Sequence, residues 1–396
     1  MTSMTRHAAV LLLIAYSFLA QKAYSENLSK VDFSYLYKDG PLKMKHKIAE
    51  NEGTYKLLLY FDLKKVTKDD DIRNFRLMSQ KKFTSGKEEI IEPLTQYVSD
   101  ENNVKVFDLT FQTNPEHEYL VIKLDFLADP YVFDIPIGPG LAYPLPNFVH
   151  KSADPNGAIV KKSDSLIFEK MGRGAGKYFG FLYKDHFSPS FPAFSTEVPD
   201  ANKRFVIEKV DPATYGYKIP NENYMYYFQN DTSSQKGVSF YSQKEYFPRN
   251  KEFDELIGPL IYIATENEFK KLETARNKKS AFDDFWLSLI PSQKLAARTL
   301  RNYFRRVAQA NVNFTSYKNG WKTDMGMIYI LYGAPDRVFK DEDAEIWEYS
   351  NYDGKVRFSF TKVPNLFTQY HYSLERSKSY TSDWFSQIER WRKGDS

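Results

Sequence analysis

Two aspartates in the C-terminal third of the 396-residue chain, Asp324 and Asp336, are the side chains whose type could support acid–base chemistry. A glycoside hydrolase needs such a pair of carboxyl groups flanking the scissile bond. Other signals of catalysis are missing from the sequence: the six histidines show no metal-ligand spacing, and no Gly-x-Ser-x-Gly motif is present. We therefore predict a protein that is not an enzyme and needs no metal or cofactor, with a glycoside hydrolase as the remote alternative.

A group of arginines on a predicted helix could bind anions. Its members are Arg298, Arg301 and Arg305. Their spacing of three and four places them on one side of the helix, while Leu300, Phe304 and Val307 fall on another face that we expect to meet the core. Arginine suits bidentate recognition of carboxylate or phosphate, so the group is a candidate docking surface. The alternative is a solvated face or local pairing with Asp283 and Asp284.

Residues 320–326 read Gly-Trp-Lys-Thr-Asp-Met-Gly and form the most distinctive motif. Its two glycines could adopt a positive φ in a tight loop. Thr323 and Asp324 carry oxygens that can cap backbone N–H groups, and Trp321 can cover the end of a core. Asp336 follows a Gly-Ala-Pro turn and can accept backbone hydrogen bonds there. We favour a structural role, and the alternative is a binding site formed by Trp321, Thr323, Asp324 and Asp336.

Helices before the motif and strands after it must position these residues. Apolar residues at helical spacing predict helices at residues 268–279, 282–289, 291–314 and 382–392. Strand patterns follow at residues 327–332, 345–349, 356–361 and 369–374. In the second of these strands, Trp347 and Tyr349 share a face suited to packing on the long helix. Residues 266–396 are therefore predicted to form an α+β domain.

The preceding sequence is dominated by strand patterns. Alternation of apolar and polar residues at 55–63, 104–111 and 119–126 predicts a β-sandwich-like domain at residues 26–150. Residues 135–155 are rich in Pro and Gly and predict a linker or an extended edge segment. A second β domain at residues 156–265 is predicted from strand-like segments at 165–170, 178–183, 204–210, 224–229, 238–241 and 260–264. The predicted fold class is thus mainly β and multidomain.

The N-terminus has the layout of a secretory signal. Arg6 precedes an apolar run at residues 8–20, and Ala23 and Ser25 supply the small residues that a signal peptidase reads. The run is too short to span a bilayer, so we predict a signal peptide at residues 1–25 that is cleaved. No other segment is apolar enough to span. The expected product is a soluble periplasmic protein.

The amino-acid composition limits the classes of ligand and partner that we expect. Cysteine is absent, which excludes disulfides and Cys-ligated metals. The formal charge of +4 falls to +2 without Arg6 and Lys22, and charges of both signs are interspersed, so no nucleic-acid partner is expected. The 29 Tyr and 31 Phe favour strands, and exposed members of this set could bind sugars.

The motif residues also carry a resemblance. The sequence Gly-Trp-Lys-Thr-Asp at 320–324, with Gly-Ala-Pro-Asp at 333–336 and Ile-Trp-Glu-Tyr at 346–349, resembles the GWxTD-domain family of bacterial envelope proteins, found mainly in Bacteroidota. Met325 stands where that family usually has Arg, and Pro291 lies in an Ile-Pro-Ser where it often has Asp-Pro-Thr. The Gly-x-Pro-Asp and Trp-x-Tyr pattern is also distantly similar to β-lactamase-inhibitor-protein-like modules, which are helical hairpins on a small antiparallel sheet that bind proteins.

These resemblances imply an envelope protein that acts through protein–protein interaction, with the GWxTD domain as its docking module. The implied partner is an unidentified envelope protein. Such a protein needs no membrane span of its own and is compatible with peripheral association with the outer membrane. A module that binds peptidoglycan or another carbohydrate through exposed aromatic residues is the alternative.

Overall fold

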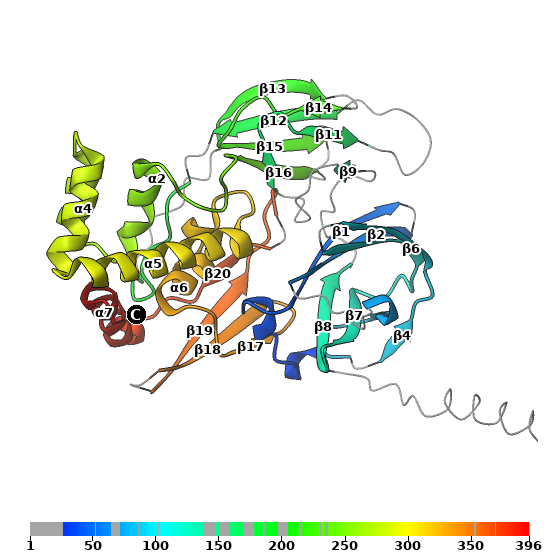
Figure 1. Cartoon of the computed structure of the whole chain (residues 1–396). Coiled ribbons are helices and arrows are strands. Elements are labelled where there is room, and N and C mark those ends of the chain that lie inside the picture. Colours follow the sequence, from blue (N-terminus) through cyan, green and yellow to red (C-terminus); the bar gives the residue numbers. More distant parts are fainter. Residues whose placement is uncertain are drawn as a thin grey trace, which may run out of the picture.

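The computed structural model describes residues 27–51, 53–64, 72–85, 87–101, 103–137, 148–150, 159–168, 178–184, 187–196, 205–213, 216–229, 231–233, 237–351, 354–368 and 370–395 (Figure 1). The predicted signal peptide at 1–25 and most of the segment 135–155 lie outside the described residues. Several antiparallel sheets precede and accompany a set of C-terminal helices, which confirms the mainly β, multidomain class. Among the described helices, none is long and apolar enough to cross a membrane.

The first region is a sandwich of two antiparallel four-stranded sheets. One sheet has the order β1-β2-β6-β5 and is formed by Leu42–Asn51, Thr54–Leu63, Val104–Gln112 and Leu94–Glu101. The other has the order β4-β3-β7-β8 and is formed by Glu88–Ile90, Arg76–Gln80, Tyr119–Phe126 and Asp129–Pro136. Alternate residues such as Leu57, Leu59 and Phe61 are buried between the sheets. The strands predicted at 55–63, 104–111 and 119–126 are confirmed.

The second region combines a larger and a smaller sheet. The larger has the order β10-β16-β15-β12-β13 and is formed by Ile159–Lys161, Val238–Gln243, Tyr224–Gln229, Tyr178–Lys184 and Ile207–Ala213. The smaller has the order β14-β11-β9 and is formed by Tyr217–Lys218, Ser165–Phe168 and Phe148–His150. The predicted strand at 260–264 is wrong, because a 3₁₀ helix, η4 (Gly258–Tyr262), occupies this position. Pro259 lies in its first turn, where the ring fixes a helical φ and offers no N–H to a strand.

The C-terminal region places helices on one antiparallel sheet. The helices are α2 (Phe253–Ile257), α3 (Glu266–Thr274), α4 (Lys278–Leu289), α5 (Gln293–Phe314), η5 (Gly320–Lys322), α6 (Asp324–Tyr332) and α7 (Thr381–Lys393). The sheet has the order β17-β18-β19-β20 and is formed by Arg337–Lys340, Ala344–Asn351, Gly354–Lys362 and Tyr372–Leu374. Trp347 is fully buried, and its ring centre lies 5.7 Å from that of Phe314 on α5. The long helix and the packing of Trp347 on it are therefore confirmed.

Residues 327–332 were predicted as a strand and are helical instead. They belong to α6, in which every residue from Asp324 to Leu331 is buried. A helix that is apolar on all sides has no 3.6-residue pattern, and a short apolar run of this kind cannot be distinguished from a buried strand by periodicity. Tertiary burial on every side of α6 thus removed the signal that would have identified it.

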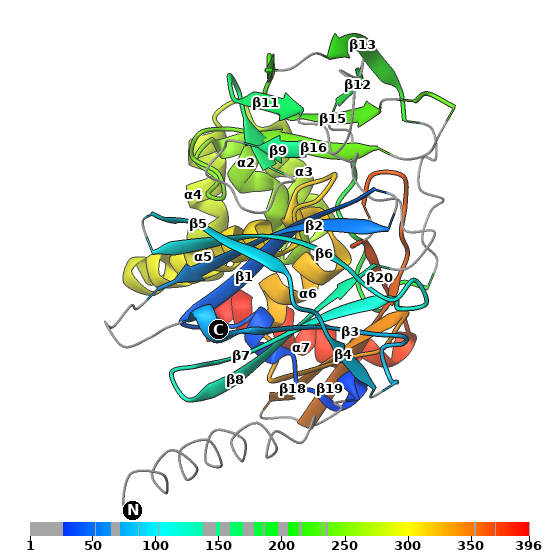
Figure 2. The same cartoon turned by 90° about the vertical axis from the view of Figure 1, so that its right-hand side faces the viewer.

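The first sandwich and the C-terminal domain share a core. The sheet β4-β3-β7-β8 points Leu120 and Ile122 into the sandwich, whereas Val121 and Val132 belong to the hydrophobic core of the C-terminal domain. At the margin of this contact, Lys340 of β17 pairs with Asp134 of β8 at 3.0 Å. Viewed from the side in Figure 2, the sandwich lies in front of α5 and α6. The two units are therefore joined by a sheet that is buried on both faces.

A short N-terminal segment reinforces this junction. It contains two 3₁₀ helices, η1 (Leu28–Lys30) and η2 (Ser34–Leu36). The N–H of Phe33 donates to the carbonyl of Val338 on β17 at 2.8 Å. The ring of Tyr37 stacks on that of Phe314, with the ring centres 5.5 Å apart, and packs against the ring of Trp347, with the centres 4.8 Å apart. Residues 28–37 thereby contribute to the core of the C-terminal domain.

Candidate functional site

Residues 320–326 bring α5, η5 and α6 together through direct backbone contact. A Cβ atom at Gly320 would lie 2.1 Å from the carbonyl oxygen of Ala310 on α5, and one at Gly326 would lie 1.9 Å from the carbonyl oxygen of Gly320. These positions require glycine because no side-chain atom fits between the two backbones. Neither glycine has a positive φ, so that expectation was wrong; the positive φ belongs to Gly333, which ends α6 at +89°.

Thr323 and Asp324 fix the start of α6. The Thr323 hydroxyl accepts from the N–H of Gly326 at 2.9 Å and donates to the carbonyl of Gly320 at 2.8 Å, which confirms its capping role. Asp324 accepts from the N–H of Leu374 on β20 at 2.8 Å and from the Arg376 guanidinium at 2.6 Å. Both charged side chains of this pair are about nine-tenths buried, at 10% and 11% exposure. The motif thus ties α6 to the edge of the sheet.

Trp321 also points inward. Its ring packs edge-on against Tyr262, with the centres 6.3 Å apart. The hydroxyl of Tyr262 donates to the Trp321 carbonyl at 2.8 Å, and the backbone N–H of Trp321 donates to the side-chain oxygen of Asn311 at 3.1 Å. At 9% exposure the residue offers almost no surface to a ligand.

Asp336 lies far from Asp324. It is exposed, and its carboxylate accepts from the N–H of Ser350 on β18 at 2.6 Å. Ser350, which contacts Asp336, pairs with Lys355 of β19, and Leu374, which contacts Asp324, pairs with Phe360 on the other side of the same strand. From strand spacing and rise, Ser350 and Leu374 are on the order of 20 Å apart. The structure therefore does not bring the two carboxylates together.

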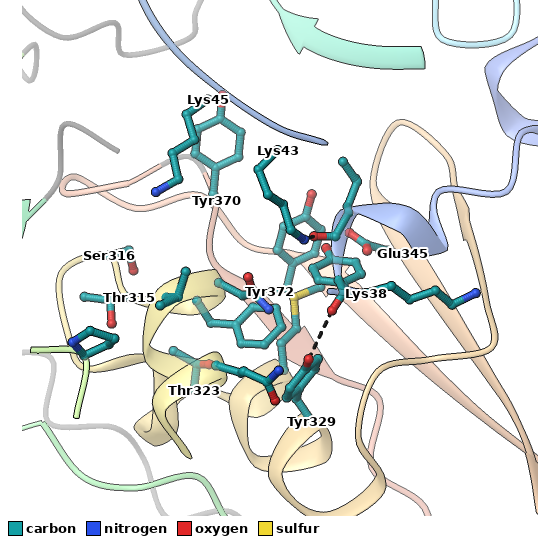
Figure 3. A pocket seen from close by; sticks show the side chains of 18 of the residues that line it. Lys38, Lys43, Lys45, Thr315, Ser316, Thr323, Tyr329, Glu345, Tyr370 and Tyr372 are labelled. Carbon is teal, nitrogen blue, oxygen red and sulfur yellow. Dashed lines mark hydrogen bonds between the residues drawn. The ribbon is translucent and has the colours of Figure 1, made fainter. Parts of the chain in front are cut away.

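A cleft of about 1180 Å³ opens beside this braced region, between the first sandwich and α5. We call it the α5–β1 cleft. Its walls include Lys43, Met44, Lys45 and His46 of β1, Arg301, Phe304 and Arg305 of α5, and Tyr370 and Tyr372 next to or on β20. Figure 3 shows Lys43 and Lys45 on the β1 side, above Thr323 and Tyr329. The Tyr329 hydroxyl donates to the Tyr37 carbonyl at 3.0 Å and so fastens α6 to the N-terminal segment at the cleft floor.

The β1 wall is basic and partly desolvated. The pKa of Lys43 is lowered to about 8, first by burial and then by the positive charge of Lys45, while Asp62 acts in the opposite direction. Burial lowers the pKa of His46 to about 4, so its ring is neutral at pH 7. The Nε2 atom of His46 lies 3.2 Å from the hydroxyl oxygen of Tyr370.

Two acidic residues of the cleft, Asp134 and Glu345, are engaged by internal partners. Asp134 is held by Lys340 at 3.0 Å. Burial raises the pKa of Glu345, although Lys340 and the indole N–H of Trp347 at 3.0 Å both oppose that rise. Among the described lining residues, lysines and arginines outnumber aspartates and glutamates by nine to six. The cleft is therefore suited to a ligand that carries negative charge.

A family model of the GWxTD domain matches residues 224–393. This chain carries a GWxTD domain. The match begins before residue 266, where the sequence patterns changed from strands to helices, and so includes β15 and β16 of the second β region. No curated protein is significantly similar to the chain.

The structure divides the predicted docking arginines of the GWxTD domain. All three are exposed, but Arg301 and Arg305 line the α5–β1 cleft, whereas Arg298 donates to the carbonyl of Gly394 near the end of the chain at 3.3 Å. Asp283, an alternative partner, is paired with Lys279 instead. The expected apolar face is also shifted, because Leu300 and Phe304 are half-buried while Tyr303 is fully buried.

Sequence reasoning missed the cleft residues that lie outside the GWxTD domain. Lys43 and Lys45 alternate with Leu42, Met44 and His46 in β1, a pattern that is typical of the solvent-facing side of any half-buried strand. Nothing in their spacing links them to Arg301, which is more than 250 residues away. Within the described ranges, no group of three or more His, Asp or Glu is arranged to hold a metal ion.

The close backbone contact in the GWxTD motif predicts an inverted effect of alanine. In an ordinary helix, Gly→Ala gains about 1 kcal/mol. At Gly326 the new Cβ would meet the Gly320 carbonyl oxygen, so we expect Gly326→Ala to lower the free energy of unfolding by about 1–3 kcal/mol in urea denaturation. Gly40→Ala is the control, since its nearest contact would be at 4.0 Å. A Gly326→Ala protein as stable as wild type would contradict the steric argument.

The buried ion pair between Asp324 and Arg376 predicts that the stability losses in a double-mutant cycle are not additive. Arg376→Met leaves the Asp324 carboxylate buried and unpaired, which should cost about 3–5 kcal/mol of stability. The double variant Asp324→Asn with Arg376→Met removes that charge and should be more stable than Arg376→Met alone. Lys279→Met, which breaks an exposed pair with Asp283, should change stability by no more than about 0.5 kcal/mol. Equal losses in the single and double variants would refute the ion-pair account.

Proposed function

We propose that this protein is an exported, non-catalytic component of a bacterial cell envelope that acts by binding a partner protein, with the GWxTD domain as docking module. One observation carries the proposal. The motif residues Trp321, Thr323 and Asp324 are buried and make internal contacts. In the same domain, the exposed side chains of Arg301 and Arg305 line a large basic cleft. A motif that braces the fold and a cleft that stays open fit a binding module.

The separation of the aspartates argues against the glycoside hydrolase alternative. Carboxyl groups that act on one glycosidic bond lie within about 10 Å of each other. Asp324 and Asp336 exceed that separation, and Asp324 is also engaged by Arg376 and by the Leu374 N–H. Neither residue is therefore placed to share a substrate with the other.

Tyr370 gives the carbohydrate alternative its support. The residue is 50% exposed and lines the cleft, where its ring could stack on a sugar. The same ring suits a peptide, since tyrosine is enriched at protein interfaces. The basic lining favours an acidic protein segment over a neutral sugar, which gains little from Lys45, Arg301 and Arg305.

A photocrosslinker at Tyr370 separates these candidates. Replacement of Tyr370 by benzoylphenylalanine in the producing cell should yield a discrete protein adduct upon irradiation of intact envelopes. Phe385 on α7 provides a matched control position, being an aromatic residue that is 51% exposed and outside the cleft lining. An adduct to peptidoglycan fragments at Tyr370 would favour the carbohydrate alternative. Identical protein adducts at both positions would remove the support for docking at the cleft.

Export has its own test. The apolar run at residues 8–20 and the small residues Ala23 and Ser25 motivate cleavage before Glu26. N-terminal sequencing of protein from the periplasmic fraction should therefore begin at or near Glu26. Recovery of intact chains that begin at Met1 from the membrane fraction would refute this part of the proposal.

A further inference from the structure

β1 is an edge strand whose open side meets the α5–β1 cleft. It ends the sheet β1-β2-β6-β5 and pairs only with β2 in the described part of that sheet. The N–H of Lys64 donates to the carbonyl of Pro41 at 2.9 Å, which identifies the odd-numbered residues of β1 as those bonded to β2. The backbone N–H and C=O groups of Met44 and His46 are therefore directed to the opposite side. Both residues line the cleft.

Positive charge flanks this open edge. Lys43 and Lys45 alternate with Met44 and so share one face of β1. Arg301 and Arg305 reach the same cleft from α5. Burial and the charge of Lys45 disfavour the protonated form of Lys43, a cost that an arriving carboxylate would offset.

The size of the cleft favours a chain segment over a small ion. Pockets for small molecules have volumes of about 300–1,000 Å³. The α5–β1 cleft, at about 1180 Å³, exceeds that range and is bordered by the backbone N–H and C=O groups of Met44 and His46 that point away from β2. Addition of a strand to a sheet edge is a general mode of peptide recognition, in which main-chain hydrogen bonds supply affinity and alternate side chains supply specificity.

We propose that the α5–β1 cleft binds an extended acidic segment of a partner protein, which adds to the sheet as a strand beside β1. This inference rests on the proposed function and names its partner class. Residues of the segment on the Lys43 face are acidic, and those on the opposite face, toward Met44 and Tyr370, are apolar. The lysines on β1 repel a basic or identical strand and thereby select an acidic one.

Binding of an acidic octapeptide of alternating Glu and Val, measured by fluorescence anisotropy with the purified protein, tests the inference. A peptide of the same composition with the four Glu and four Val in separate blocks is the control for charge alone. We expect the alternating peptide to bind about tenfold more tightly, and its affinity to fall as salt rises. Equal affinities for the two peptides, or no binding of either, would overturn the inference.

Variants locate the binding surface. Arg301→Glu with Arg305→Glu should weaken binding of the alternating peptide by about tenfold or more. Lys294→Glu with Arg298→Glu makes the same change of charge on the same helix outside the cleft lining and should have a much smaller effect. Both variants are first checked for an unchanged melting temperature. Equal weakening by the two pairs would reject the cleft as the site.

Proline at Met44 tests strand addition itself. Met44→Pro removes the outward N–H without breaking the β1–β2 ladder, because that N–H faces away from β2. Met44→Ala is the matched control for the lost side chain. We expect Met44→Pro to bind the alternating peptide about tenfold more weakly than Met44→Ala, and equal binding would exclude pairing with β1.

The two levels of proposal fail separately. A cleft-specific protein adduct at Tyr370, together with an alternating peptide that does not bind, would overturn strand addition and leave partner docking in place. Loss of the Tyr370 adduct together with absent peptide binding would overturn both.

Discussion

The contact that the C-terminal domain depends on is the backbone-to-backbone approach at Gly320 and Gly326. Without a side chain at Gly320, η5 lies directly against Ala310 of α5, and without one at Gly326, the start of α6 lies directly against Gly320. The Thr323 hydroxyl bridges Gly320 and Gly326 across the second of these contacts. The first turn of α6 then directs Asp324 to β20, where Arg376 neutralises it. A larger residue at either glycine would separate α5 from α6 and misplace the buried carboxylate. The residues of the motif therefore act together to hold α5, η5, α6 and β20 in contact.

This arrangement also determines where the cleft can form. α6 is fixed from one side by α5 and from the other by the sheet, and Tyr329 fastens it to the Tyr37 carbonyl. Tyr37 in turn packs against both Phe314 and Trp347, so the N-terminal segment is part of the domain core. Because the sheet β4-β3-β7-β8 is buried on both faces, the sandwich is held against this core and β1 is presented to α5. The cleft walls are thus positioned by packing on rigid elements.

The buried residues of the GWxTD motif are distinct from the charged residues that line the cleft. Trp321, Thr323 and Asp324 are buried, whereas Arg301, Arg305 and the β1 lysines line the cleft.

The sequence by itself determined the elements whose residues repeat with a clear period. The sandwich strands and the helix ending at Phe314 were predictable because one face of each is buried and the other is solvated. Capping by Thr323 and burial of Trp347 followed from residue type and position. Only the tertiary structure decided that α6 is a helix, since burial on all sides erases periodicity. It alone decided that the two motif glycines serve close approach, that Asp324 and Asp336 lie apart, and that Arg301 and Lys43 line one cleft. Those facts depend on contacts between distant segments, which local residue patterns do not encode.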